Sequence, residues 1–260
     1  MNEQTRAYWQ YEYDVTSLYM IPLLQRWGIS VRGASVIDVG CGEGGGLCAM
    51  YDAGAAPCCG FDVEFGRVEA ANSLKGHRDI PFALGNLYDE QTPFGAFQFD
   101  LVVLHDVFEH LDCKDEVMQK LARYANPRGK IMITFPPYYS AYGAHQQLLN
   151  THWAKVPFFH LLPFALTGIL PRLKDEHPHI VQEIQKLGRL KMGMKKFEEI
   201  VRRNRLRILG KQAYFVSPNH IRFGLRPLPA GKIAELPILG EILCTGVVYV
   251  LGKSSESSQS

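Results

Sequence analysis

A glycine-rich turn near the N-terminus constrains this chain more than any other feature. The short apolar run Val36–Val39 leads directly into Gly40-Cys41-Gly42-Glu43-Gly44. Such an apolar, β-branched run is typical of a strand buried on both faces. Glycine lets the backbone adopt positive φ and come close to a ligand. The pattern G-x-G-x-G differs from the G-x-G-x-x-G dinucleotide fingerprint, and no Lys-Ser/Thr pair follows as in a P-loop. The turn therefore predicts a strand–turn–helix unit shaped for a ligand.

The rest of the chain continues this alternation of strands and helices. Apolar strands are expected at 35–39, 57–61, 80–84, 99–104 and 130–135, and helices at 45–53, 65–74 and 114–124. Repeated βα units predict an α/β fold with a parallel sheet covered on both faces. Asn126–Gly129 is expected to be a turn. A helix at 194–204 and strands at 206–216 and 246–251 should complete the sheet with an antiparallel edge.

Four short sequence motifs resemble those of a known protein family. They are residues 36–44, 60–62, 85–87 and 99–103, and Asp62 ends the second apolar run, where a ribose-binding carboxylate is expected. In order and spacing they resemble the class I S-adenosylmethionine-dependent methyltransferases. The resemblance covers roughly residues 30–137. It implies a Rossmann-like sheet, mostly parallel with an antiparallel C-terminal strand, and S-adenosyl-L-methionine as the cofactor.

The resemblance also implies a cofactor site at the strand ends. Backbone N–H groups of the glycine turn and the following helix are expected to meet the methionine carboxylate. Asp62 should accept from the ribose hydroxyls, Asn86 should face the adenine, and His105 should lie beside the methionine arm. The expected set is Asp38, Gly40, Cys41, Gly42, Asp62, Val63, Asn86, Leu87 and His105.

A group of ionisable residues follows the fourth strand. Residues i, i+3 and i+4 of a helix share one face, so Asp106, Glu109 and His110 are expected to converge. Two carboxylates and an imidazole could hold Mg²⁺ or Zn²⁺. This Asp-x-x-Glu-His motif resembles the Glu-x-x-Glu-His motif of ubiquinone-biosynthesis O-methyltransferases and small-RNA 2′-O-methyltransferases, with Asp in place of the first Glu. The alternative is structural: Glu109 caps or pairs, and His110 packs.

The loop after the fifth strand is dense in Tyr, His and Gln, as expected of a loop that contacts an acceptor. His145 is our first choice as general base, because a neutral imidazole can take a hydroxyl proton near pH 7. His145 could instead complete a metal site or bond to backbone. His105, at the exit of strand four, is the second catalytic candidate.

The predicted organisation has five parts: cap helices at 1–30, an α/β core at 31–137, an inserted lid at 138–190, the C-terminal part of the core at 191–253, and a disordered tail at 254–260. The lid contains the proline-broken apolar run 155–172 and is expected to cover an apolar acceptor pocket. A basic run from Lys186 to Lys211 follows. It is either a solvated helix face or a patch that meets RNA phosphates, a phosphorylated substrate or, as the apolar lid beside it favours, an anionic membrane surface.

The composition is typical of a globular protein. The 260 residues are 47% hydrophobic and 21% charged, which argues against extensive disorder. No run reaches 18 apolar residues, so no transmembrane helix is predicted. Six cysteines without CxxC spacing, and no visible signal peptide, predict reduced thiols in a cytoplasmic protein, with membrane association left open.

The sequence therefore predicts methyl transfer from S-adenosylmethionine to a small or lipid-like acceptor, with O-methylation favoured. Such an enzyme must hold the methyl group in line with the nucleophile. One alternative keeps the cofactor but catalyses a rearrangement or cyclisation without methyl transfer. Another is RNA 2′-O-methylation, although no RNA-binding module is recognisable. The acceptor's identity and the oligomeric state do not follow from the sequence.

Overall fold

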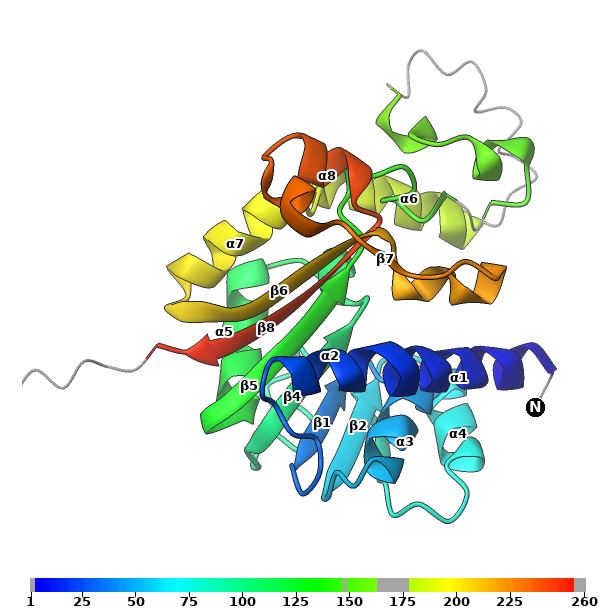
Figure 1. Cartoon of the computed structure of the whole chain (residues 1–260). Coiled ribbons are helices and arrows are strands. Elements are labelled where there is room, and N and C mark those ends of the chain that lie inside the picture. The colour runs from blue at the N-terminus through cyan, green and yellow to red at the C-terminus, as the bar shows by residue number, and fades with distance from the viewer. Residues whose placement is uncertain (1–2, 147–148, 163–177, 255–260) are drawn as a thin grey trace, which may run out of the picture.

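An eight-stranded sheet runs through the protein in the order β3-β2-β1-β4-β5-β8-β6-β7 (Figure 1). The computed structural model describes residues 3–146, 149–162 and 178–254. The strands are β1 Val36–Val39, β2 Cys58–Asp62, β3 Phe82–Leu84, β4 Phe99–His105, β5 Ala125–Phe135, β6 Leu206–Val216, β7 Leu228–Pro229 and β8 Gly246–Lys253. The first five pair in parallel, and β8 is antiparallel to both β5 and β6. This confirms the predicted α/β fold with an antiparallel C-terminal strand.

Helices cover both faces of this sheet. The N-terminal segment is nearly continuous, with α1 Glu3–Val15, a π-helical turn η1 Thr16–Met20 and α2 Ile21–Arg26. The other α-helices are α3 Gly45–Asp52, α4 Phe65–Leu74, α5 Lys114–Tyr124, α6 Pro178–Leu190, α7 Met194–Arg203 and α8 Leu239–Leu243. Short 3₁₀ turns are η2 Phe108–His110, η4 His152–Lys155, η5 Phe159–Leu161, η8 Pro218–Phe223 and η9 Gly231–Glu235.

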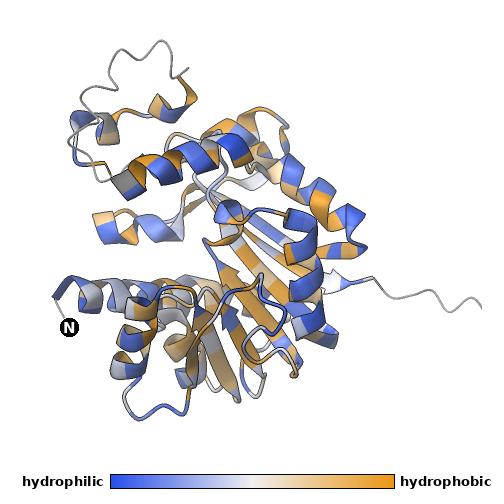
Figure 2. Ribbon diagram, turned by 180° about the vertical axis from the view of Figure 1, so that it is seen from behind, coloured by the Kyte–Doolittle hydropathy of each residue, from blue (hydrophilic) through white to orange (hydrophobic). Residues whose placement is uncertain are grey.

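Two apolar cores lie on opposite faces of the sheet. Val102 packs into the core that contains α5 and α7, whereas its neighbour Val103 packs into the core that contains α1 to α4. Successive residues of a strand point to opposite faces, so both faces of β4 are buried. Figure 2 shows the resulting band of hydrophobic strands beneath the helices. This is why the strands read as unbroken apolar runs rather than alternating ones.

One local prediction was wrong. Asn126–Gly129 belongs to β5 instead of forming a separate turn. The turn chemistry is present, because Asn126 Oδ1 accepts from the Arg128 backbone N–H at 3.0 Å. It produces a bulge, however: Ala125 pairs with Phe99 and Lys130 pairs with Leu101, so the intervening residues are looped out within the strand.

The described residues between β5 and α7 lie above the carboxyl edge of the sheet (Figure 1). Its described residues form a small core of their own: Tyr138, Ala144, Leu149, Phe159, Ile184 and Leu187. Much of the apolar run 155–172, like most of the predicted tail at 254–260, lies outside the described residues. Within the described chain, no helix is both long and apolar enough to cross a bilayer. All six cysteines are free thiols, five of them buried and Cys113 exposed.

Candidate active site

The glycine turn after β1 requires glycine for steric reasons. Gly40 has φ of 79°, and a Cβ on it would lie 2.7 Å from Val107 Cγ2. Gly42 also has positive φ, and its N–H donates to Asp62 Oδ2 at 2.9 Å. The other oxygen of Asp62 accepts from the Glu64 N–H at 2.9 Å. The turn therefore brings its backbone against the carboxylate that ends β2.

Two adjoining cavities surround this turn. The smaller, of about 110 Å³, is lined by Asp38, Gly40, Cys41, Gly42, Asp62 and His105 among the predicted residues. The larger, of about 720 Å³, is lined by Gly40, Asp62, Val63, Asn86 and Leu87. All nine predicted cofactor residues therefore line one cavity or the other. The fold brings together the places where the resemblance puts the methionine and adenosine ends of the cofactor.

The polar groups at these cavities fit a cofactor with a charged arm. Asp38 is 6% exposed, and its Oδ1 has no hydrogen-bond partner in the described chain. Burial raises the pKa of Asp38 to about 7. A buried carboxylate oxygen without a partner is costly unless a donor occupies the space in front of it. The smaller cavity provides that space.

Helix α1 supplies residues that sequence reasoning missed. Tyr8, Tyr11 and Glu12 line the smaller cavity, and Glu12 Oε2 accepts from the Gly45 N–H at 3.3 Å. The N–H groups of Gly42 and Gly45 are therefore already bonded to side-chain carboxylates. This does not support the expectation that they meet the methionine carboxylate. The spacing of positions 8, 11 and 12, one helical face within an aromatic run, was the signal available in the sequence.

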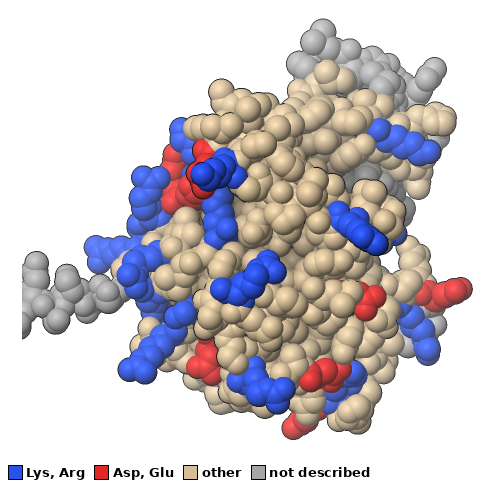
Figure 3. Space-filling view, viewed as in Figure 1, with Lys and Arg blue, Asp and Glu red and all other residues tan. Residues whose placement is uncertain are grey.

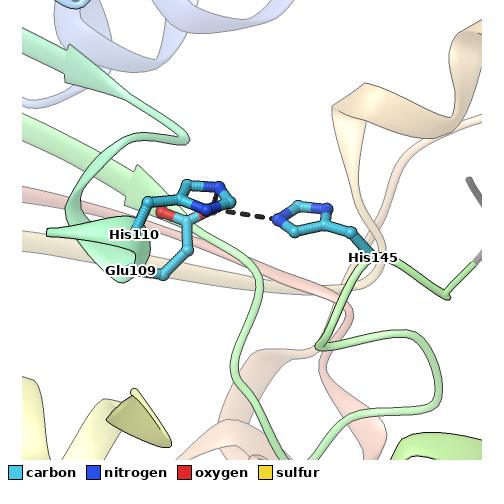
Figure 4. Close-up of side chains that lie close together, drawn as sticks. All are labelled: Glu109, His110 and His145. Atoms are coloured by element: carbon cyan, nitrogen blue, oxygen red, sulfur yellow. Dashed lines mark hydrogen bonds and ion pairs between the residues drawn. The ribbon is translucent and has the colours of Figure 1, made fainter. Parts of the chain in front are cut away.

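Glu109, His110 and His145 form the second part of the site (Figure 4). Glu109 is 1% exposed, and its Oε1 lies 3.4 Å from His110 Nε2 and 3.3 Å from His145 Nε2. The two imidazole rings stack at 5.0 Å with 13° between their planes. One potential ligand atom from each residue lies within 4.8 Å of the others. Glu183 from α6 bonds to His110 Nδ1. These side chains can hold either a proton on an imidazole or a metal cation between them.

Asp106 is not part of this group, so the expected convergence of Asp106 with Glu109 and His110 was wrong. Asp106 has φ of 52°, and the 3₁₀ turn η2 begins only at Phe108. Its Oδ1 accepts from Thr134 Oγ1 at 2.7 Å, and its Oδ2 accepts from the Asn219 amide. Because the chain leaves β4 in a left-handed conformation, the i, i+3 geometry of a helix does not apply. His145, instead of Asp106, lies beside Glu109 and His110.

The charges in this group are tightly coupled. Burial opposes a charge on His110, but Glu109 and Glu183 raise the pKa of this imidazole to about 10. Burial likewise opposes ionisation of Glu109, yet His110 and His145 hold the pKa of that carboxyl well below its usual range. At neutral pH, His110 is therefore a protonated imidazole between two carboxylates. Glu109 Oε2 is buried and has no hydrogen-bond partner in the described chain.

The two predicted catalytic histidines lie in different cavities. His145 lines the larger cavity, together with His110. His105, the last residue of β4, lines the smaller cavity beside Asp38, and its Nε2 lies 3.9 Å from Asp106 Oδ2. The structure thus places His145 near the space available to an acceptor and His105 near the predicted methionine arm.

The larger cavity combines apolar and polar groups in its lining. Beyond the cofactor residues, its described lining includes Tyr142, His179, Lys186, Asn219, His220 and Arg222. Part of the predicted lid lies outside the described residues, so the apolar acceptor pocket stays a prediction. The imidazole, amide and guanidinium groups favour an acceptor that carries polar or charged groups.

The sequence is similar to known methyltransferases. A family model described as "Methyltransferase domain" matches residues 11–180. A probable chloroplastic tocopherol O-methyltransferase of Oryza sativa subsp. japonica is 33% identical over 103 residues, 38% of this chain and 28% of that protein. The phosphoethanolamine N-methyltransferase of Plasmodium falciparum (isolate 3D7) is 29% identical over 106 residues, 40% of this chain and 39% of that protein. The chain thus spans well under half the length of these relatives.

Solved structures share the whole fold at low sequence identity. Magnesium protoporphyrin IX methyltransferase of Synechocystis PCC 6803, with bound S-adenosylhomocysteine, superposes with a TM-score of 0.53 at 15% identity. The match covers 94% of this chain and 84% of that one. An S-adenosylmethionine-dependent methyltransferase from Mesorhizobium loti gives 0.55 at 14% identity, covering 88% and 95%. Since the family model matches more than half of the sequence, the chain belongs to the class I S-adenosylmethionine-dependent methyltransferases.

Proposed function

We propose that this protein methylates a hydroxyl oxygen of a small acceptor that binds in the larger cavity. The observation that carries the proposal is that His110 and His145 line the same cavity as Asp62 and Asn86. S-adenosylmethionine supplies an electrophilic methyl group on its sulfonium. The protein's own task is to hold the acceptor oxygen in line with that methyl, exclude water and take up the hydroxyl proton.

His145 is the imidazole available to accept the proton. His110 already carries one, because its pKa is raised to about 10 between its two carboxylate neighbours, although burial opposes the charge. If His145 donates its Nε2–H to Glu109, the lone pair of the ring lies on Nδ1. Once His145 is protonated, Glu109 at 3.3 Å stabilises the positive charge. As the acceptor oxygen bonds to the methyl carbon, the S–CH₃ electron pair stays on sulfur and the proton passes to His145.

The same residues could hold a divalent cation. One carboxylate and two imidazoles are a donor set that suits Zn²⁺ or a similar metal, and the unpartnered Glu109 Oε2 leaves a lone pair for it. Glu109, His110 and His145 would be the ligands, and Glu183 would orient His110 through its Nδ1. A bound metal would lower the pKa of an acceptor hydroxyl, and the site would require His110 to lose its proton.

The test is transfer of a labelled methyl group to a panel of acceptors. Tocopherol and phosphoethanolamine, the substrates in the names of the relatives, are the first oxygen and nitrogen acceptors to assay. With a responsive oxygen acceptor, His145→Ala should lower kcat by about 10²–10⁴-fold while the affinity for S-adenosylhomocysteine stays unchanged. Methylation confined to amines would contradict O-methylation. Cofactor turnover without a methylated product would point to rearrangement.

Metal analysis separates the two roles of the histidines. If a cation is required, dialysis against a chelator should abolish transfer, and added Zn²⁺ or Mg²⁺ should restore it. If His145 acts as the base, the chelated enzyme should keep full activity and contain no bound metal. Full activity in both the chelated enzyme and the His145→Ala variant would remove both roles and leave positioning alone as the source of catalysis.

We also propose that the protein contacts an anionic membrane surface, with the apolar part of an amphiphilic acceptor left in the bilayer. Exposed apolar residues cluster in the segment from η8 to α8, where Phe223 is 59%, Leu228 54% and Ile238 72% exposed. Arg226 and Lys232 lie within the same segment. Figure 3 shows an area with few charged side chains over β7. Apolar side chains combined with basic ones favour an interface of this kind.

The basic run supports this proposal only in part. Lys and Arg gather beside α7 and the β6–β8 end of the sheet (Figure 3), but Arg203 pairs with Asp115 at 2.8 Å and Lys211 pairs with Glu198 at 2.8 Å. Flotation with phosphatidylcholine vesicles containing phosphatidylglycerol tests the contact. Leu228→Ser/Ile238→Ser should reduce binding, whereas Leu18→Ser, equally exposed on the N-terminal segment, should not. Equal binding by all three proteins would contradict the assigned surface.

A further inference from the structure

Helix α1 brings a carboxylate to the cofactor site from outside the glycine motif. We propose that Glu12, together with Asp38, binds the α-ammonium group of the methionine arm, so that α1 is part of the cofactor site. The inference rests on the proposed function only through the cofactor, and it is independent of the acceptor. It gives Glu12 a role in selecting a ligand with a free amino group.

The position of Glu12 is closely fitted to the glycine turn. Its Oε2 accepts from the Gly45 N–H at 3.3 Å, and its Oε1 lies 2.9 Å from where a Cβ on Gly42 would stand. A Cβ on Gly45 would lie 2.1 Å from the backbone oxygen of Trp9. The absence of a Cβ at Gly42 and Gly45 therefore lets α1 pack closely against the turn. Glu12 and Asp38 line the same small cavity, from α1 and β1 respectively.

This cavity has excess negative charge. Within the described chain, neither Glu12 nor Asp38 has a cationic side chain within 4.0 Å. Arg67 lines this cavity as well, but its guanidinium pairs with Glu64 at 3.1 Å and with Glu43 at 3.7 Å. Asp38 is nine-tenths buried, and its Oδ1 has no partner. Two neighbouring carboxylates in a poorly solvated space favour a cation between them.

The ammonium group is the cation that best fits this place. A small primary ammonium carries three N–H donors, enough for Asp38 Oδ1 and the carboxylate of Glu12. Neither residue belongs to a cluster with metal-ligand spacing among the described residues. The other cation of the cofactor, the sulfonium, carries the methyl that must face an acceptor in the larger cavity. The smaller cavity lies beyond Gly40 and Asp62, which line both spaces, on the side of the amino-acid end.

Calorimetry with two ligands tests the inference. One is S-adenosylhomocysteine, whose ammonium is its only cation near neutral pH. The other is its deaminated analogue, in which hydrogen replaces the ammonium. Glu12→Gln keeps a carbonyl oxygen for the Gly45 N–H but removes the charge. We expect it to weaken S-adenosylhomocysteine binding by about 10- to 100-fold and binding of the analogue by less than about threefold.

Two further variants keep the test interpretable. Asp38→Asn should show the same selective loss. If thermal unfolding shows that Glu12→Gln is not folded, Asp38→Asn is used in its place. Glu3→Gln, an exposed change on the same helix, should bind both ligands like the wild type. If the wild-type protein binds no S-adenosylhomocysteine, the proposed function and its cofactor fail together.

Other outcomes overturn only the role of Glu12. Equal weakening of both ligands would show that Glu12 merely positions α1 against the turn. Unchanged affinity for both would exclude contact with the ligand. Weakening of S-adenosylmethionine but not S-adenosylhomocysteine would assign the carboxylates to the sulfonium. Tighter binding of S-adenosylhomocysteine by the variant would mean that Glu12 competes with the methionine carboxylate at the start of α3.

Discussion

The buried carboxyl of Asp38 should make the ligand-free protein less stable as the pH rises. Burial raises its pKa to about 7 in the folded protein, whereas an unfolded aspartate titrates near 3.9. Between these values the folded state holds a proton that the unfolded state has released. The free energy of unfolding therefore falls as pH rises from about 4 to about 7, the reverse of a salt-bridged aspartate. Above pH 7 this contribution is constant.

The size of the effect follows from the shift. A difference of about 3 pKa units corresponds to about 4 kcal/mol at the upper limit. About 1.5 kcal/mol of this is already lost at pH 5, so about 2–3 kcal/mol remains to be lost between pH 5 and pH 8. Asp38→Asn has nearly the same shape and cannot ionise. It should therefore gain about 2–3 kcal/mol relative to the wild type over this range.

Urea unfolding followed by circular dichroism at pH 5 and pH 8 measures this difference directly. Titrating groups far from Asp38 change both proteins alike, so the comparison reports Asp38 together with its neighbour Glu12, whose pKa Asp38 helps to raise. A stability difference between variant and wild type that is the same at both pH values would refute the reasoning. It would mean that Asp38 is solvated or paired in the folded protein, and it would remove the electrostatic basis for a cation at the smaller cavity.

Three further predictions follow from the geometry. Asp62→Ala should weaken S-adenosylmethionine binding by about 1–3 kcal/mol in calorimetry, because it removes charge-assisted bonds, and unchanged affinity in a folded variant would contradict the assignment. Phe108→Ala should cost about 3–5 kcal/mol in urea unfolding, since the ring is fully buried edge-on to Phe197 at 5.2 Å. The 62% exposed Phe65, changed to Ala, is its control and should cost far less. Glu183→Gln should speed amide exchange in α6, because Glu183 ties this helix to His110; unchanged exchange would show that the apolar contacts of Ile184 and Leu187 suffice.

The core of the fold could be predicted because its signals are local. Each of the five parallel strands is an apolar run such as Val36–Val39, and its place in a βα unit fixes its direction. The bulge at residues 126–129 could not be predicted, because Asn, Pro and Gly indicate a change of direction without showing whether pairing resumes beyond it. Only the register against β4 decides between a turn and a bulge.

The candidate site was predictable where its residues come from one motif, and not where they come from different ones. Asp38, Gly40 and Asp62 are positioned by the strand ends that carry them. The pairing of Glu109 with His145 joins positions 36 residues apart, and it depends on the path of the loop after β5. Glu12 reaches the turn from 33 residues away through the packing of α1 on α3. Spacing rules describe one helix or strand and contain no information about such contacts.

The misplaced Asp106 shows where the two halves of the site must meet. Asp106 lines both cavities, together with Gly40, Asp62 and Val107, so these residues mark the junction between them. If the acceptor binds beside His145 and the amino-acid arm of the cofactor lies by Asp38, as we propose, the reacting methyl belongs at this junction. Asp106 has φ of 52° there, a conformation that costs a non-glycine residue about 1–3 kcal/mol. Bonds from Thr134 and Asn219 maintain it. The sequence predicted this carboxylate as a metal ligand, whereas its contacts with Thr134 and Asn219 assign it to shaping the junction.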